Sequence, residues 1–586
     1  MSVDLWTILL PAVIAVPLLW AVFMMAGENR IALALAPWTP LPALILSIFG
    51  AASAPDLEIP FVLMGATLGM DAFSRVFLLF TALLWWTAGL HARGYIAPER
   101  QREFFGYFLS AMAGNLGLLI ARDLVSFYTL YALMSFASYG LVIHTRSDLA
   151  RYAGKIYLKL VVLGELMLFP ALVAGYAGSR ELMIADWAAA LAGNPHAEIL
   201  AVLLLLGFGI KAGALPLHVW LPLAHPAAPT PASAVLSGAM IKAGLFGICV
   251  FLPLGAWQSI PLGIAVMTLS LLAAALGALW AIPQTHPKAL LAYSSISKMG
   301  PMTFAAGAAL HQPDLWPLSA TAILIFAAYH ALTKGALFLS VGAATAFPRE
   351  RRRLLALAAF LPLFVFAGFP ITAGAIAKLP FTALKKPMDP TWAGWLNAVL
   401  LLVAFATVIL LYRFWLLLAR EAENARPHPS RAIWIPWLMA VLMSALLPVA
   451  YFALGWGDYV SIALKPGKWL SALPPLLLGL FAALAAARWG GRSLPTLPPG
   501  DLLLLYRRIP RILARLIPSG LSELVARPTS SAQPFVNGAV RRIQQWLPVK
   551  PFLEGSGRLE KWLMDGPLAG TLLLTLFLAM ILTLTM

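Results

Sequence analysis

The sequence predicts an all-α polytopic membrane protein, and three observations point to this fold class. Of the 586 residues, 61% are hydrophobic and only 11% are charged, whereas soluble domains are about half apolar and about one quarter charged. The apolar residues form continuous runs, long enough for membrane helices of about 20 residues, instead of the alternation that a membrane β-barrel needs. In addition, two runs are interrupted by glycine and proline close to a lysine, a pattern typical of helices that are broken at ion sites.

About sixteen apolar segments, bounded by charged residues or by proline and glycine clusters, each predict one membrane helix. The first begins near Leu5 and has neither a basic residue ahead of it nor a small-residue cleavage site, so we interpret it as a retained helix rather than a signal peptide. In chain order the segments are residues 5–25, 33–53, 72–92, 104–121, 124–144, 156–178, 199–217, 232–254, 260–283, 288–309, 318–346, 355–379, 393–419, 433–455, 469–487 and 566–586.

Lysine and arginine are distributed unevenly between alternate loops, which predicts the orientation of the chain. One set of loops carries Arg93, Arg146 and Arg351, and the other carries Asp56 and Glu181. Because basic loops face the cytoplasm, both termini are predicted outside, in a bacterial-type inner (cytoplasmic) membrane. The net charge of +17 then reflects these loops, and we do not expect nucleic acid as a partner. Four lysines of outside loops depart from the pattern: Lys385, Lys386, Lys465 and Lys468.

The cysteine content limits the chemistry of the chain. The single cysteine, Cys249, lies within an apolar run, which excludes disulfides and cysteine-ligated zinc or iron–sulfur clusters within this chain. No flavin or nucleotide motif is present either. We therefore predict no cofactor, no metal and no catalytic residue, and any redox chemistry would lie in partner subunits.

Ionisable side chains inside apolar spans are costly unless they are paired or hydrated, so they mark candidate functional positions. A lysine near a helix end can instead extend to the interface, which is the alternative reading. Glu165 is the only carboxylate near the middle of a span, and His330 and Lys334 share one helix face through their i, i+4 spacing. We predict a proton pathway through Glu165, Lys211, Lys242, Lys298, His330, Lys334 and Lys378.

The two interrupted runs each carry one of these lysines. Proline removes a backbone donor and glycine weakens a helix, so carbonyl groups are left to bind water or side chains. The runs lie five spans apart, and because five is odd, two repeated copies would be inverted in the membrane. A packing kink is the alternative reading. The expected helix breaks are Gly213 and Pro216 beside Lys211, and Pro370 and Gly374 before Lys378.

Several short patterns surround these residues: Gly213–Pro222, Ala228–Leu236, Met240–Gly244, Tyr293–Gly300 and His330–Phe338. Together they strongly resemble the signature of the antiporter-like subunits of respiratory complex I and of Mrp-type cation/proton antiporters. Clear similarity covers about residues 103–385. The signal is specific, because it combines several motifs in one order.

The resemblance implies two inverted five-helix repeats, each with a broken helix, and a hydrated file of charged residues that moves protons along the membrane midplane. By position, Lys211 matches the lysine of the first broken helix and Lys242 the connecting lysine. His330 and Lys334 match the relay of the second half, and Lys378 matches the terminal residue of the second broken helix.

One departure concerns the acid that the family places in its fifth helix. That position reads as Ala132 here, so the acidic partner of Lys211 is missing. Glu165, on the next span, could take its place from a neighbouring helix. We favour this relocation over loss of the acid.

The domain organisation follows from the spans and the resemblance. Residues 488–565 mix apolar and basic residues at helical spacing, which predicts a helix along the cytoplasmic interface, similar to a short lateral helix; a solvated loop is the alternative. The predicted divisions are 1–102 (helices 1–3), 103–254 (first repeat), 255–420 (second repeat), 421–487 (helices 14 and 15), 488–565 (interfacial segment) and 566–586 (last helix).

We therefore predict a proton-translocating membrane subunit of a multisubunit complex of the complex I, Mrp antiporter or membrane hydrogenase kind. The expected partners are other membrane subunits, membrane lipids and protons, with sodium as an open alternative. Two other functions stay open: a non-conducting scaffold, and an energy-coupling subunit for inorganic carbon uptake. Five interior lysines argue against a scaffold, because apolar residues there would remove the burial cost.

Overall fold

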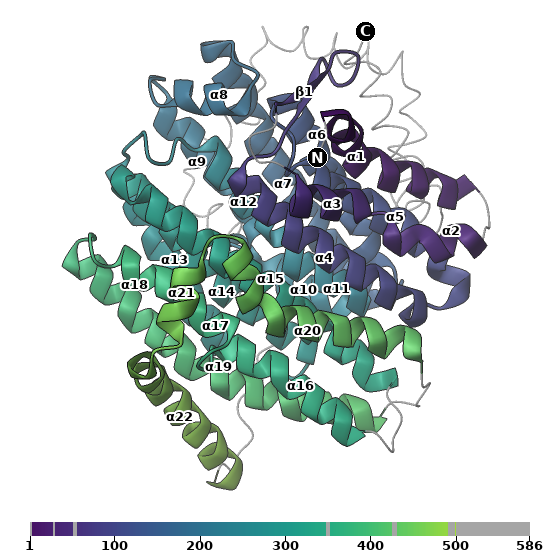
Figure 1. Cartoon of the computed structure of the whole chain (residues 1–586), viewed down its shortest axis with the longest axis vertical. Coiled ribbons are helices and arrows are strands. Elements are labelled where there is room, and N and C mark those ends of the chain that lie inside the picture. Colours follow the sequence, from purple (N-terminus) through teal and green to yellow (C-terminus); the bar gives the residue numbers. More distant parts are fainter. Residues whose placement is uncertain are drawn as a thin grey trace, which may run out of the picture. The chain divides into compact units, whose positions relative to one another are not determined.

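The computed structural model describes residues 3–26, 30–50, 55–346, 352–424, 430–489 and 499. The predicted interfacial segment and the predicted last helix lie outside these residues. Figure 1 shows the described part as a bundle of helices with one small hairpin.

The first half of the described chain contains twelve α-helices and one hairpin. They are α1 (Val3–Ala26), α2 (Arg30–Leu35), α3 (Leu41–Phe49), β1 (Leu57–Ile59), β2 (Ala66–Leu68), α4 (Ala72–Tyr95), α5 (Pro98–Gly117), α6 (Leu124–Ile143), α7 (Asp148–Ser179), α8 (Ile184–Leu191), α9 (Ala197–Ala212), α10 (Trp220–Ala227), α11 (Thr230–Val235) and α12 (Ile241–Phe251). The 3₁₀ turns η1 (Ala36–Trp38) and η2 (Leu217–Val219) and the π-helical turn η3 (Leu236–Met240) connect some of them.

The second half continues with helices only. They are α13 (Ile260–Ala281), α14 (Pro287–His311), the 3₁₀ turn η4 (Pro313–Leu315), α15 (Trp316–Ala346), α16 (Arg352–Ala367), α17 (Ala373–Ile376), α18 (Leu379–Leu384), α19 (Pro390–Asn424), α20 (Arg431–Ala453), α21 (Gly457–Ala463) and α22 (Pro466–Trp489).

The chain is a multi-pass membrane protein. Within the described residues, twelve helices are long and apolar enough to cross a membrane, which confirms the predicted fold class. The shorter apolar helices Leu357–Ala367 and Ala373–Leu384 do not reach this length. The total of sixteen spans, the inverted repeats and the domain boundaries stay predictions.

Helix α15 lies among several other helices, as Figure 1 shows. It contacts α4, α14, α16, α18, α19 and α20, and residues 325–344 of this helix are all buried. Helices α13 and α14 pack along each other, and glycines bring their backbones close. A Cβ on Gly277 would lie 2.7 Å from the Ser297 nitrogen, and one on Gly300 would lie 2.5 Å from the Ser270 oxygen. Small residues permit such close approach in membrane helix pairs.

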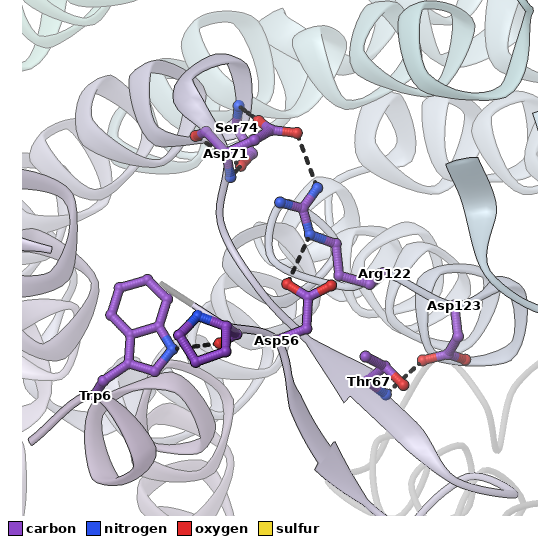
Figure 2. A network of polar contacts seen from close by, with 8 residues as sticks. Trp6, Asp56, Thr67, Asp71, Ser74, Arg122 and Asp123 are labelled. Carbon is purple, nitrogen blue, oxygen red and sulfur yellow. Dashed lines mark hydrogen bonds and ion pairs between the residues drawn. The ribbon is translucent and has the colours of Figure 1, made fainter. Parts of the chain in front are cut away.

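A polar cluster fixes the starts of α4 and α6 against the hairpin (Figure 2). The Arg122 guanidinium lies 3.5 Å from a carboxylate oxygen of Asp56 and 2.9 Å from one of Asp71. Asp71 also caps α4, because its carboxylate accepts a hydrogen bond from the Ser74 nitrogen. Burial opposes ionisation of Asp71, but the hydrogen bonds from Arg122 and Ser74 outweigh it, so the pKa of Asp71 lies below its usual value.

The adjacent Asp123 caps α6 in the same region. Its carboxylate accepts hydrogen bonds from the Ser126 nitrogen at 2.7 Å and from the Thr67 nitrogen at 2.8 Å. The cap therefore joins the first turn of α6 to strand β2. This fixes the rotation of α6, the helix that carries Ala132.

Candidate functional site

The first broken helix places Lys211 at the end of α9. The helix ends at Ala212, and Gly213 follows with φ of 73°, a left-handed conformation that favours glycine. The chain then continues through η2 into α10. Lys211 is only 3% exposed, so its ammonium group depends on partners inside the protein.

Those partners come from α7 and α10. The Lys211 ammonium donates a hydrogen bond of 3.0 Å to the Tyr157 hydroxyl, which donates in turn to the Ser135 carbonyl at 2.8 Å. The same ammonium lies 5.3 Å from the Tyr157 ring centre and 6.0 Å from that of Trp220. Two aromatic faces and one hydroxyl partly replace the water that a buried cation loses.

Glu165 lies two turns further along α7, on the same side as Tyr157. It is 9% exposed and interacts electrostatically with Lys211. Near Glu165, helices α7 and α9 approach each other closely, since a Cβ on Gly164 of α7 would lie 3.4 Å from the Gly207 oxygen of α9. Glu165 and Lys211 do not form an ion pair, because the three ion pairs in the described part of the chain involve other residues.

Glu165 also faces α6. The Tyr128 and Tyr131 side chains both interact electrostatically with its carboxylate. Positions 128, 131 and 132 share one face of a helix, so Glu165 approaches the face that carries Ala132. The carboxylate oxygen Oε2 of Glu165 has no hydrogen-bond partner among the described residues.

Lys242 lies just after the π-helical turn η3. In this turn the Ile241 nitrogen donates to the Leu236 oxygen, five residues earlier, and the Lys242 ammonium donates to the Ser237 carbonyl at 2.9 Å. The Ser237 and Ser295 hydroxyls are 2.6 Å apart. Such π turns frequently occur at functional sites, and this one joins Lys242 to α14.

Lys298 and Lys334 both lie close to the Phe366 ring of α16. Their ammonium groups are 5.1 Å and 4.6 Å from its centre. Lys334 also donates hydrogen bonds to the Leu291 carbonyl, at 2.6 Å, and to the Ser294 hydroxyl. Lys298 donates to the Thr407 hydroxyl of α19 at 3.2 Å. Both lysines are almost completely buried.

His330 lies one turn before Lys334 and is fully buried. It interacts electrostatically with Lys242, Lys298 and Lys334. Neither ring nitrogen has a hydrogen-bond partner within the described residues. An imidazole with two free nitrogens, placed among three ammonium groups, can accept a proton on one side and donate one on the other.

Lys378 follows the second interruption, between α17 and α18. Its ammonium donates to the Ala367 carbonyl at 3.2 Å and interacts electrostatically with Lys298. The lysine packs against Gly368, where φ is 76° and an added Cβ would lie 2.5 Å from the lysine nitrogen. Lys378 is more accessible than the other lysines of the series.

Two buried cationic side chains were missed by the sequence prediction. Lys288 donates to the Ala228 carbonyl at 2.6 Å and interacts with Glu421. His225 stacks on Phe338, with ring centres 4.6 Å apart, and interacts with both Lys288 and Lys334. Lys288 lies near the start of its helix, where extension to the interface is the usual expectation; the helix packing that buries it is not visible in sequence.

The described residues contain no group of three or more His, Cys, Asp or Glu side chains placed to hold a metal ion. Cys249 is buried. The functional groups that the fold brings together are thus ammonium, imidazole, carboxylate and hydroxyl groups, which exchange protons.

A protein-family model described as NADH:quinone oxidoreductase/Mrp antiporter, TM, matches residues 121–412. Over this region the chain belongs to the NADH:quinone oxidoreductase/Mrp antiporter family. The matched region contains every residue of the predicted proton pathway. The predicted recognition of this family is therefore confirmed.

Relatives of the chain include hydrogenase-4 component B of Escherichia coli K12, which is 31% identical over 55% of this chain and 51% of its own length. The F(420)H(2) dehydrogenase subunit N of Methanosarcina mazei is 26% identical over 75% of this chain and 94% of its own length. The chain thus matches about half of the first relative.

The fold is also similar to a solved structure. A chain of the Mrp complex from Dietzia sp. DQ12-45-1b superimposes with a TM-score of 0.72, over 92% of this chain and 62% of that chain, at 21% identity. At this identity the similarity establishes the fold alone.

Proposed function

We propose that the chain is a proton-translocating membrane subunit of a multisubunit complex in a bacterial-type inner membrane. The observation that supports this most is a series of buried ionisable side chains, each interacting electrostatically with the next. The longest part of the series runs from Lys242 of α12 through His330 and Lys334 to Lys298 and Lys378. None of these residues has an ion-pair partner among the described residues.

The mechanism follows from charges that affect one another at short range. When one lysine of the series gains a proton, its charge opposes protonation of its neighbours, so protons move along the series stepwise. Glu165 and Lys211 exchange a proton through intervening water, while the Tyr157 hydroxyl holds the lysine by accepting its hydrogen bond. Further along the series, His330 passes protons between Lys242 and the pair Lys298 and Lys334.

The pair Glu165 and Lys211 and the series that begins at Lys242 meet where α9 and α12 cross. A Cβ on Gly244 would lie 2.4 Å from the Phe208 oxygen and 2.6 Å from the Ala212 nitrogen, so the backbones that carry Lys211 and Lys242 lie close together. Water is needed to carry a proton between Lys211 and Lys242. The energy for transport, whether from redox chemistry or from an exchanged cation such as sodium, comes from partner subunits.

The proposal is tested by proton flux into liposomes that contain the intact complex or the purified chain, under an imposed potential. Lys211→Met is expected to abolish flux. Lys159→Met is the matched control, because Lys159 lies on α7 but is exposed. Absence of flux in a wild-type complex that is otherwise active would support the scaffold instead.

A further inference from the structure

A cavity of about 290 Å³ lies between α18, α19 and α22. Three lysines line it: Lys378, Lys385 and Lys468. No carboxylate is among its lining residues, and the three ion pairs of the described part of the chain lie elsewhere. The Lys385 ammonium donates to the neutral Asn397 side chain at 2.6 Å. The cavity therefore concentrates positive charge that the described residues do not neutralise.

Two of these lysines were already exceptional in the sequence. Lys385 and Lys468 belong to the four lysines that break the alternation of basic and acidic loops, in loops predicted to lie outside. Basic residues are disfavoured there, so a ligand that needs them would account for their presence. The fold brings one from the end of α18 and one from the start of α22 to the same cavity.

Most of the other lining residues are apolar, with Thr382, Asn397 and Ser471 as the polar exceptions, and the cavity wall reaches the exposed surface of the protein. Leu401 of α19 lines it and is 48% exposed, and most of α22 is exposed along its apolar length. Trp469 lies at the start of α22, where its indole nitrogen donates to the Ala463 carbonyl at 2.7 Å. Tryptophan at this position is typical of the level of lipid headgroups.

We propose that this cavity binds an anionic phospholipid. The phosphodiester pairs with the ammonium groups of Lys385 and Lys468, and an acyl chain lies along the apolar wall of α19. Lys378 faces the same anion from the inner end of the cavity. A free phosphate ion would use the lysines but leave the apolar wall without a ligand, which favours the lipid. The lipid site does not depend on proton transport.

The test compares lipid affinities of the delipidated full-length chain by native mass spectrometry, with phosphatidylglycerol and phosphatidylcholine as probes. Each lysine near a membrane surface contributes about 1 kcal/mol toward anionic lipid, so Lys385→Gln with Lys468→Gln is expected to weaken phosphatidylglycerol binding on the order of 25-fold. Phosphatidylcholine binding should stay unchanged. The single variant Lys468→Gln should show about a fivefold loss if the double variant does not fold.

The matched control is Lys386→Gln with Lys465→Gln, since these lysines are neighbours in sequence but do not line the cavity. Wild-type affinity for phosphatidylglycerol in this control supports the site.

An equal loss of affinity in both pairs of variants would show general attraction of anionic lipid to the protein surface and would overturn the proposal. Full displacement of phosphatidylglycerol by excess inorganic phosphate would identify a free-anion site, and loss of a neighbouring subunit from the complex at unchanged lipid affinity would identify a protein partner; either result overturns the proposal.

Discussion

Glu165 approaches the very face of α6 from which the expected acid is missing. Its carboxylate interacts with Tyr128, Tyr131 and Lys211, although it extends from α7. An acid displaced by one helix can act on the same lysine, because electrostatic interaction depends on distance and burial and not on which helix carries the group.

The Glu165→Gln variant is therefore expected to lose proton flux by about a hundredfold, as for removal of a positioned acid or base, while Glu165→Asp retains some. Adding Ala132→Glu to Glu165→Gln should restore part of the flux, since it returns the acid to the same helix face. The exposed Glu181→Gln serves as control. Wild-type liposome flux in the Glu165→Gln variant would rule out the relocation.

Gly368 is required by the position of Lys378. A Cβ there meets the lysine nitrogen at 2.5 Å, and φ of 76° is strained for any other residue. Gly368→Ala should lower the free energy of unfolding by about 1–2 kcal/mol and reduce flux by moving Lys378. Gly394→Ala is the control, because nothing lies within 4 Å of its added Cβ. Unchanged flux and thermal unfolding in Gly368→Ala would contradict this account.

At the level of elements, Arg122 joins the hairpin to the start of α4. The pKa of Asp71 is lower in the folded state than in the unfolded chain, so its contribution to stability is complete above the unfolded value of about 3.9 and is lost as pH falls through the folded value. Arg122→Gln should lower the free energy of unfolding by no more than about 1 kcal/mol at neutral pH.

The difference in the free energy of unfolding between Arg122→Gln and wild type should become smaller once Asp71 is protonated in both proteins. Thermal unfolding in detergent at neutral pH and near pH 3 measures it, with the exposed Arg151→Gln as control. A difference that is the same at both pH values would mean that Arg122 acts through packing alone.

The sequence predicts which segments are helical much better than it predicts local irregularities within those helices. Continuous apolar runs set the helices, and glycine and proline mark the end of α9 near Gly213. The π turn η3 was not predicted, because Leu236–Met240 contains residues compatible with an ordinary helix, and the extra residue per turn is fixed by contacts of Ser237 and Lys242 that form only in the folded chain.

At the scale of the whole molecule, the sequence predicts which charged side chains are buried, but it does not predict which residues lie next to them in the folded chain. Interior lysines stand out in apolar runs, because a charged side chain there is costly unless it is paired or hydrated. Helix rotation is set by packing, so neither the grouping of Lys298 and Lys334 about Phe366 nor the burial of His225 and Lys288 could be predicted. Nor does the sequence predict that Lys385 and Lys468, which come from separate loops, line the same cavity.

The cost of the buried cations leads to a prediction about the whole fold. Lys242 is 1% exposed, and among the described residues its ammonium donates to the Ser237 carbonyl and has no ion-pair partner, so Lys242→Met keeps most of the side-chain volume and removes a costly buried group. Replacing a buried ion pair by apolar residues is often neutral or stabilises a protein by about 1–4 kcal/mol, and a buried lysine without an acidic partner carries the same desolvation cost. We expect Lys242→Met to unfold at a higher temperature than wild type while conducting no protons, and Lys159→Met to change neither property. If Lys242 instead stabilised the folded structure of a scaffold, its removal would lower the unfolding temperature. Measuring both the unfolding temperature and the proton flux of the Lys242→Met variant therefore distinguishes a conducting subunit from a scaffold.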